Sequence, residues 1–232
     1  MTDPLSGEQV IARIREQTDT ILLAFSCGKD SIGTWLECRR HFSHIIPFYM
    51  YLVPGLEFVE RSLRYYEQWF GCHILRVPHP SLYRMLANLV FQPPERLSVL
   101  AAARLPIFDY PDMYAAVRQS ASVPDAAYVA SGVRAVDSPY RMVAIKRYGA
   151  INHKKRHFFP LWDWRKDRLL AAIQSSGVKL PADYRVFGRS FDGLDYRFLA
   201  PIRDTWPDDY RRILEFFPLA ELEIKRREYG KI

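Results

Sequence analysis

The stretch that most constrains the fold of this chain is residues 21–42, where an apolar run leads through a glycine-containing turn into a helical pattern. Five consecutive apolar residues, 21–25, are typical of a buried strand. The turn is Ser26–Ser31, with the sequence SCGKDS, and after it apolar residues recur at spacings of three and four. Strand, tight loop and helix in this order indicate a unit of a parallel α/β sheet.

The groups in this turn are suited to binding phosphate. A helix that begins at such a turn directs unpaired N–H groups, and the positive end of its dipole, at whatever lies there. Ser26 and Ser31 add hydroxyl donors, Gly28 lets a ligand approach the backbone, Lys29 adds a positive charge, and Asp30 is suited to hold Mg²⁺. The turn is not a Walker P-loop, which needs GxxxxGK followed by Ser or Thr. The alternative is an ordinary strand-to-helix turn.

Strand and helix patterns alternate along the first third of the chain, which predicts a parallel sheet. The expected helices are 6–19, 57–70, 81–89, 95–104 and 210–229, the expected strands are 21–25, 45–53, 73–77 and 127–130, and 177–200 is expected to be a loop. The predicted fold class is α/β, with a Rossmann-like, doubly wound, mainly parallel sheet, helices on both faces and a helical C-terminal extension. We expect residues 1–200 to form the nucleotide-binding domain and 201–232 the extension.

A second candidate site follows the strand predicted at 127–130. Gly132 and Arg134 come directly after it, followed by Asp137, Ser138 and Arg141. A glycine at a strand end permits close approach of a ligand, and an arginine offers a fork of donors for phosphate or sulfate. The carboxyl ends of parallel strands share one edge of the sheet, so we expect this segment to face the first loop. The alternative is that both arginines are surface residues.

Other charged residues are weaker candidates. Lys154, Lys155 and Arg156 form a basic cluster, predicted to project near the rim of the nucleotide cleft, where it would meet the triphosphate, an anionic substrate or nucleic acid. Glu60, on the helix predicted at 57–70, is a candidate substrate contact. A solvated face is the alternative for all four.

The motifs resemble a known superfamily. The loop Ser26–Ser31 is similar to the SxGKDS pyrophosphate loop of the PP-loop ATP pyrophosphatases, also called adenine nucleotide alpha-hydrolases. The GxR..DS..R element from Gly132 to Arg141, and weaker similarities at 53–60, 158–173 and 181–190, resemble the phosphoadenosine phosphosulfate (PAPS) reductase-like family most. At 53–60 the chain departs from the family, because Val53 and Pro54 stand where the family has Asp and Thr.

The resemblance implies a HUP-type fold that binds ATP or a related adenine nucleotide and cleaves it at the alpha-phosphate, adenylating a substrate and releasing pyrophosphate. It implies catalytic roles for Lys29, Asp30 and Arg134, with Mg²⁺ at Asp30. The nucleotide-binding residues that it implies are Ser26, Cys27, Gly28, Lys29, Asp30, Ser31, Gly132, Arg134, Asp137, Ser138 and Arg141. Such a transferase or hydrolase would act in sulfur transfer or nucleic-acid modification.

The positions of the cysteines help to distinguish between adenylation and sulfonucleotide reduction as the function of the chain. True PAPS reductases use a C-terminal cysteine, and here none follows Cys72, so reductase activity is not expected and neither is an iron–sulfur cluster. Cys38 is a candidate sulfur carrier, and the helix dipole could lower the pKa of Cys27. For these cysteines a structural thiol is the preferred interpretation, and Cys72 is expected to be buried. The alternatives to adenylation are a sulfonucleotide reductase or sulfotransferase that uses a partner's thiol, and a nucleotide-binding regulator without activity.

Composition limits the partners. The 232 residues carry a formal net charge of +7, which favours acidic partners such as nucleotides or nucleic acid. No apolar run is long enough to span a membrane, and no signal peptide is recognised, so we expect a cytoplasmic protein. A sulfur-donor protein is a further expected class of partner, and a homodimer is left open.

Overall fold

The computed structural model describes residues 4–230, and the chain groups into two compact units. The first comprises Met1–Tyr49, Trp69–Arg76 and Pro111–Leu180, and the second comprises Met50–Gln68, Val77–Tyr110 and Pro181–Ile232. The domain boundary predicted at residue 200, between a nucleotide-binding domain and a C-terminal extension, stays a prediction.

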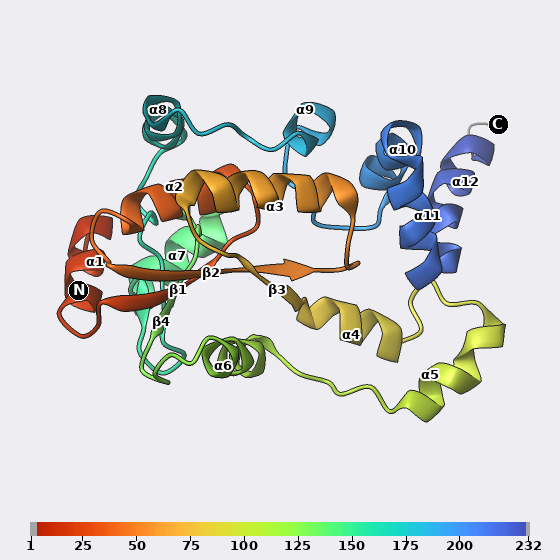
Figure 1. Ribbon diagram of the computed structural model, residues 1–232, viewed down its shortest axis with the longest axis horizontal. Coiled ribbons are helices and arrows are strands. Elements are labelled where there is room, and N and C mark those ends of the chain that lie inside the picture. Colours follow the sequence, from red (N-terminus) through yellow and green to blue (C-terminus); the bar gives the residue numbers. More distant parts are fainter. Residues whose placement is uncertain (1–3, 231–232) are drawn as a thin grey trace. The chain divides into compact units, whose positions relative to one another are not determined.

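Within residues 4–230, the strands form one six-stranded sheet in the order β3-β2-β1-β4-β6-β5 (Figure 1). The strands are β1 Thr20–Ala24, β2 His44–Tyr51, β3 Leu75–Pro78, β4 Tyr128–Ala130, β5 Ile151–Asn152 and β6 His157–Phe158. β1 pairs in parallel with β2 and β4, β4 pairs in parallel with β6, and only the edge strand β5 is antiparallel among the described pairs.

The strand order confirms the predicted doubly wound α/β class. The chain moves outward from β1 to β2 and β3 on one side, and then returns to place β4 on the other side of β1. Ligands in such sheets bind beyond the carboxyl ends of the two strands at which the order reverses. Here those strands are β1 and β4, so the loop Ser26–Ser31 and the segment that begins at Ser131 lie at this point.

The helices of the first unit cover both faces of the sheet. They are α1 Gly7–Arg15, α2 Lys29–Cys38, α6 Tyr110–Ser120, α7 Pro139–Tyr148 and α8 Lys166–Ser176, with the short 3-10 helix η2 at Ala135–Asp137. α2 and α6 lie on opposite sides of β1 and β2 (Figure 1). α8 packs closely on α2, because a Cβ atom at Gly33 would lie 2.2 Å from Leu169 Cδ1.

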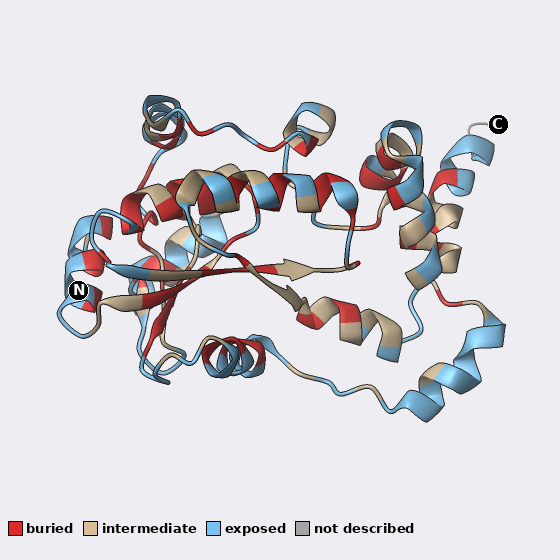
Figure 2. Ribbon diagram, viewed as in Figure 1, coloured by how far each residue is buried: buried red, intermediate tan, exposed pale blue. Residues whose placement is uncertain are grey.

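The core of the first unit is centred on β1 and on the inner face of α2 (Figure 2). Ile21 and Leu22 are completely buried, and the ring of Trp35 packs edge-on against Phe25 at 5.0 Å. Trp162 and Trp164 are also buried, which confirms their interpretation as core aromatics. This packing fixes the end of β1 relative to the start of α2.

The second unit is helical, with an aromatic core of its own. Its helices are α3 Glu57–Phe70, α4 Pro80–Ala87, α5 Leu97–Ala103, α9 Asp183–Phe187, α10 Tyr196–Thr205, α11 Pro207–Phe216 and α12 Leu222–Tyr229. Phe58 stacks on Trp206 at a centroid distance of 4.6 Å. The Asp209 carboxylate accepts hydrogen bonds from the N–H groups of Glu57 and Phe58, and so caps α3.

Two of the sequence expectations about local structure are wrong. The expected loop 177–200 contains α9 and the first half of α10, and the expectation missed α10 because its helix includes Pro201 and follows a stretch rich in Gly and Asp. Helix α6 was not expected either, because prolines lie close to both of its ends. Among the described residues, no helix is both long and apolar enough to cross a membrane.

Candidate functional site

The loop Ser26–Ser31 is closed by its own hydroxyl groups. Ser31 Oγ accepts hydrogen bonds from the Ser26 N–H at 3.2 Å and from Ser26 Oγ at 3.3 Å, and it donates to the Gly28 carbonyl at 2.9 Å. Ser26 Oγ also accepts from the Gly28 N–H at 3.4 Å. The Ser31 hydroxyl was expected to donate to a ligand, but in this structure its proton holds the loop in shape.

The two glycines of the candidate site serve different purposes. Gly28 is the N-cap of α2 and has φ −77°, a value that any residue adopts; the left-handed position in the loop is Cys27, at φ 59°. Gly132 meets the loop itself, because a Cβ there would lie 2.7 Å from the Asp30 carbonyl oxygen and 2.9 Å from the Ser31 nitrogen. Gly132 was expected to admit a ligand, whereas the backbone that approaches it belongs to the loop.

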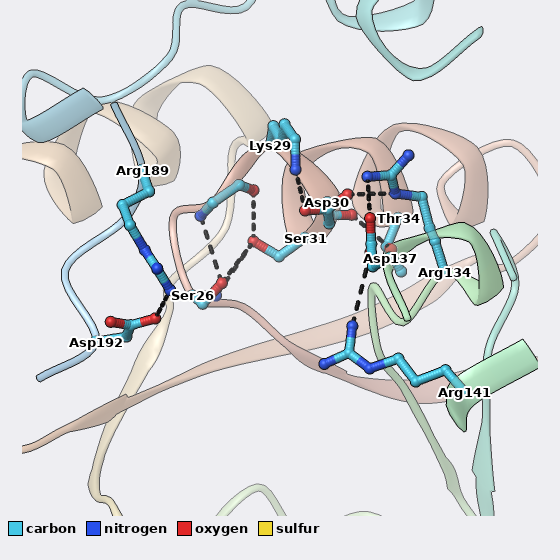
Figure 3. Close-up of polar contacts among 11 residues, drawn as sticks. Ser26, Lys29, Asp30, Ser31, Thr34, Arg134, Asp137, Arg141, Arg189 and Asp192 are labelled. Atoms are coloured by element: carbon cyan, nitrogen blue, oxygen red, sulfur yellow. Dashed lines mark hydrogen bonds and ion pairs between the residues drawn. The ribbon is translucent and has the colours of Figure 1, made fainter. Parts of the chain in front are cut away.

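The loop and the segment after β4 are joined by a chain of alternating charges (Figure 3). Lys29 Nζ lies 2.6 Å from Asp30 Oδ2, and Arg134 Nε lies 2.6 Å from Asp30 Oδ1. Arg134 Nη2 then donates to Asp137 Oδ1 at 2.7 Å, and Arg141 Nη1 lies 3.6 Å from Asp137 Oδ2. The structure therefore brings together residues predicted from two motifs that lie about 100 positions apart in the sequence.

Arg134 is the most deeply buried charge in this chain of ion pairs. The residue is 2% exposed, and among the residues that the structure describes its Nη1 atom is buried and has no hydrogen-bond partner. Leaving a buried donor unsatisfied costs about 1–3 kcal/mol, and more for a charged group. Native structures satisfy most such donors. Because protein atoms cover Nη1, an acceptor from a ligand would reach it only after a neighbouring group, such as the Asp30 carboxylate, is displaced.

The amino end of α2 adds to the positive potential at the loop. Its N-cap is Gly28, which has no side chain with which to cap the first turn. The helix dipole is equivalent to about half a positive charge at this end. Thr34 Oγ1 donates to the Asp30 carbonyl at 2.8 Å and fastens the first turn of the helix, a role that was not predicted.

The remaining residues predicted for the site, Ser138, Arg141 and Glu60, lie on or at the start of helices α7 and α3, outside the loop Ser26–Ser31. Ser138 is the N-cap of α7, and Arg141 lies on that helix with its side chain largely exposed. Glu60 is on α3, in the second unit, and partly buried. Its role as a substrate contact stays a prediction.

The basic cluster lies where the parallel strands β4 and β6 begin, opposite the ends of the strands that carry the loop Ser26–Ser31. Lys154, Lys155 and Arg156 immediately precede β6, which runs parallel to β4 with His157 in register with Val129. The cluster is therefore at the amino-terminal edge of these strands, where the Arg156 guanidinium donates to the Asp125 carbonyl. The expectation that it lies at the rim of the nucleotide site is wrong, because β5 and β6 form a hairpin whose turn points away from that edge.

The sequence reasoning missed a hydrogen-bonded pair at the carboxyl end of β4. His157 Nε2 and Ser131 Oγ are 2.9 Å apart, and the imidazole also packs against the rings of Tyr114 and Phe159. Burial, with a smaller contribution from the charge of Lys155, lowers the pKa of His157 to about 4. No motif joins the two residues, and only the register of β4 and β6 brings them together.

Burial limits the sulfur chemistry of the cysteines, because Cys27 and Cys38 are both buried. Cys38 is 0% exposed, and burial, followed by the negative charge of Glu37, raises the pKa of its thiol. A buried, protonated thiol is a poor nucleophile, which excludes Cys38 as a sulfur carrier in this conformation. Cys72 is partly exposed, so the expectation that it is buried is wrong.

Mg²⁺ was expected at Asp30. No group of three or more His, Cys, Asp or Glu side chains among residues 4–230 is arranged to hold a metal ion. Asp30 alone fits an ion that arrives with a nucleotide, because Mg²⁺ in such sites uses one or two carboxylates together with the phosphates.

Comparisons with known proteins identify no family for this chain. No protein-family model matches the sequence, and no curated protein matches it. Among solved structures, the chain is similar to the NH3-dependent NAD synthetase from Campylobacter jejuni subsp. jejuni NCTC 11168 in complex with the nitrate ion. The TM-score is 0.47 at 13% sequence identity, and the match covers 97% of this chain and 95% of that one. Similarity at this level assigns no activity to the chain, and the resemblance to the PAPS reductase-like family stays a prediction.

Proposed function

We propose that this protein binds ATP, or a closely related adenine nucleotide, with its phosphates at the loop Ser26–Ser31, and cleaves it at the α-phosphate. The observation that carries the proposal is the buried guanidinium of Arg134, whose Nη1 atom lacks a partner within the described residues beside this loop. A phosphate group that displaces the Asp30 carboxylate would supply the missing acceptor, and hydrogen bonds between guanidinium and phosphate are among the strongest in proteins.

Charge supports phosphate as the ligand. Along the chain of ion pairs, Lys29, Arg134 and Arg141 contribute +3, and Asp30 and Asp137 contribute −2, so a net charge of +1 remains. The dipole of α2 adds to that charge. In the structure, the two carboxylate oxygens of Asp30 contact Lys29 Nζ and Arg134 Nε. A polyphosphate also presents anionic oxygens and carries more negative charge, so it would replace the carboxylate at both cations. Asp30 would thus hold both cations in position until the nucleotide enters.

The reaction that fits these residues is transfer of the adenylyl group. An oxygen or sulfur atom of an acceptor would form a bond to the α-phosphorus, while the bond from that phosphorus to the bridging oxygen breaks. Pyrophosphate would leave with the electron pair, and Lys29 and Arg134 are placed to stabilise the negative charge that develops on it. Mg²⁺ held at Asp30 would supply further charge neutralisation. The assignment to the α-phosphate rests on the resemblance of the loop to the pyrophosphate loop.

The alternatives are less well supported. A sulfonucleotide reductase needs a thiolate, and Cys38 is buried while no cysteine follows Cys72. A sulfotransferase would need the thiol of another protein. A regulator without activity would bind the nucleotide through the same residues and leave it intact. Cleavage of the bound nucleotide therefore distinguishes the proposed enzyme from a regulator.

The test is the release of pyrophosphate from ATP that is labelled in its γ-phosphate. We expect labelled pyrophosphate, and not labelled orthophosphate, from the wild type, and a much slower release from Lys29→Ala. The matched control is Lys154→Ala, because Lys154 is an exposed lysine that lies at the opposite, amino-terminal edge of β4 and β6. Binding of intact ATP without any product, with or without candidate acceptors, would favour the regulator. Labelled orthophosphate as the product would contradict the proposal.

A further inference from the structure

Helix α7 presents a broad exposed surface that carries two aromatic and three basic side chains. Tyr140 is 82% exposed, Val143 63% and Tyr148 71%, although large apolar side chains are normally buried. We call this face the α7 surface, and define it as Tyr140, Arg141, Val143, Lys146, Arg147 and Tyr148.

Helical geometry spreads these residues over more than half of the circumference of α7, so they form a broad surface with one central stripe. Tyr140, Val143 and Arg147 follow the spacing of three and seven that lines one side of a helix. Ile145, the one residue of α7 that is buried among those described, points to the opposite side and anchors the helix. Tyr148 and Arg141 lie together on one flank of this stripe, between it and Ile145, and Lys146 lies on the other flank. The two tyrosines lie about 12 Å apart along the helix axis, since each residue advances it by about 1.5 Å.

The charge of this surface indicates what would cover it. The segment Pro139–Tyr148 contains three basic residues and no acidic one. The guanidinium of Arg147 lies over the ring of Tyr148, 5.2 Å from its centre. Aromatic rings interleaved with cations are the arrangement on which single-stranded nucleic acids bind, because bases stack on the rings while the cations contact phosphates. An apolar protein partner would cover Lys146 and Arg147, for which α7 itself offers no acidic side chain.

The α7 surface lies at the same edge of the sheet as the loop Ser26–Ser31. α7 follows η2 beyond the carboxyl end of β4, and leads into β5. Ile151, the first residue of β5, pairs with Phe158, which is in register with Ala130 at the carboxyl end of β4. Both ends of α7 are thus at that edge, and the contact of Arg141 with Asp137 connects it to Arg134 and the loop (Figure 3).

We propose that the α7 surface binds single-stranded nucleic acid, and that the bound strand is the acceptor in the adenylyl transfer. The second half of this proposal rests on the proposed function. In that transfer, a hydroxyl oxygen of the strand bonds to the α-phosphorus and its proton passes to water, while the bond to the bridging oxygen breaks and pyrophosphate leaves with the electron pair. The first half, binding, is independent of ATP.

Binding is tested by fluorescence anisotropy with a labelled single-stranded oligothymidylate longer than roughly 16 nucleotides, without ATP. Tyr140→Ala and Tyr148→Ala should each weaken binding about 5- to 100-fold, because each removes a stacking platform. Tyr229→Ala is the matched control: Tyr229 is 73% exposed, lies beside basic residues on α12, and should leave the affinity unchanged. An abasic strand with the same number of phosphates should bind the wild type and both tyrosine variants equally weakly.

The cations are tested by the salt dependence of binding. The triple variant Arg141→Gln, Lys146→Gln, Arg147→Gln should flatten the slope of log K against log salt by about 2, since each single-strand contact contributes about 0.7. The corresponding change at the opposite edge, Lys154→Gln with Lys155→Gln, should leave the slope nearly unchanged. A slope lost with the second variant and kept with the first would overturn the assignment to α7.

The link to the nucleotide site has its own readout. Lys29→Ala should weaken ATP binding about tenfold to a hundredfold and leave oligonucleotide binding intact. Tyr140→Ala should retain ATP binding and lose the stimulation of pyrophosphate release by the strand. Unchanged oligonucleotide affinity in both tyrosine variants would overturn the proposal, whatever the outcome for ATP. So would a wild-type dimer that the same substitutions convert to a monomer, because the surface would then be covered by a second copy of the chain.

Discussion

Arg134 Nε donates to Asp30 Oδ1 at 2.6 Å, although the two residues are 104 positions apart in the sequence. The contact joins the amino end of α2 to the segment after β4, and the second oxygen of the same carboxylate holds Lys29. One carboxylate thus positions two cations that the proposed function assigns to phosphate. The substitution of Asp30 therefore has opposite effects on stability and on the binding of free phosphates.

Asp30→Asn should lower the free energy of unfolding and raise the affinity for metal-free pyrophosphate. The stability loss should be about 1–3 kcal/mol, because the buried guanidinium of Arg134 loses one of its two charged partners and keeps Asp137, while the amide oxygen keeps one hydrogen bond. Removing a negative charge beside Lys29 and Arg134 should strengthen pyrophosphate binding about tenfold, measured by calorimetry in EDTA. Release of pyrophosphate from Mg²⁺-ATP should fall. Weaker binding of pyrophosphate in EDTA would show that Asp30 does not compete with the ligand.

Gly132→Ala should distort the loop Ser26–Ser31. The new Cβ would lie 2.6 Å from the Asp30 carbonyl carbon and 2.7 Å from its oxygen, so backbone must shift. Overpacking of this kind costs about 1–3 kcal/mol, which denaturant titration would measure, and ATP affinity should fall with it. Gly193→Ala is the control, because the nearest atom to a Cβ there is 3.7 Å away. Full stability and full ATP affinity in Gly132→Ala would show that the loop does not rest against β4.

The stability of the protein should depend on pH through His157. Burial lowers the pKa of His157 from 6.5 to about 4, so the unfolded chain binds more protons than the folded chain between these values. The contribution is fully present above pH 6.5 and is lost as the pH falls toward 4. The difference amounts to at most about 3 kcal/mol, at 1.36 kcal/mol per pKa unit.

Denaturant titrations of the wild type and His157→Gln, from neutral pH down to about pH 4, isolate this effect from that of the carboxylates. The wild type should lose more stability over this range than the variant does. Equal losses in the two proteins would mean that His157 is not held neutral by its surroundings.

The thiols should differ in their reactivity. Cys38 is completely buried and burial raises the pKa of its thiol, whereas Cys72 is partly exposed. A thiol reagent followed by mass spectrometry should modify Cys72 in the folded protein, and Cys38 only after unfolding. The isolated protein should release no sulfite from PAPS with thioredoxin as the reductant. Sulfite production that survives replacement of all three cysteines by Ser would contradict this account of the sulfur chemistry.

The fold at the site was predictable because its signals are local. An apolar run followed by SCGKDS and a helical pattern predicts a strand, a loop and a helix in this order. The predicted strand, 21–25, differs from β1, Thr20–Ala24, by one residue at each end, and α2 begins inside the predicted loop at Lys29. Gly132 and Arg134 were found for the same reason, since they directly follow a strand. The contacts that Gly132 and Arg134 make depend on the order of the strands, which is not a local signal. Strands β5 and β6 are each only two residues long, so the sequence shows no periodic pattern from which their direction could be predicted. This explains why Lys154 and its neighbours were assigned to the wrong edge and why the Ser131–His157 pair was missed.

The measurement that tests the central claim most directly is calorimetric titration of Mg²⁺-ATP into the wild type, Lys29→Ala, Arg134→Lys and the control Lys154→Ala. We predict a dissociation constant of about a millimolar or tighter for the wild type and the control. Each substitution in the site should weaken binding about tenfold to a hundredfold, because each removes a charge-assisted hydrogen bond to phosphate worth about 1.5–3 kcal/mol. Equal affinity in all four proteins, or no binding by the wild type, would contradict the placement of the nucleotide phosphates at Ser26–Ser31 and Arg134.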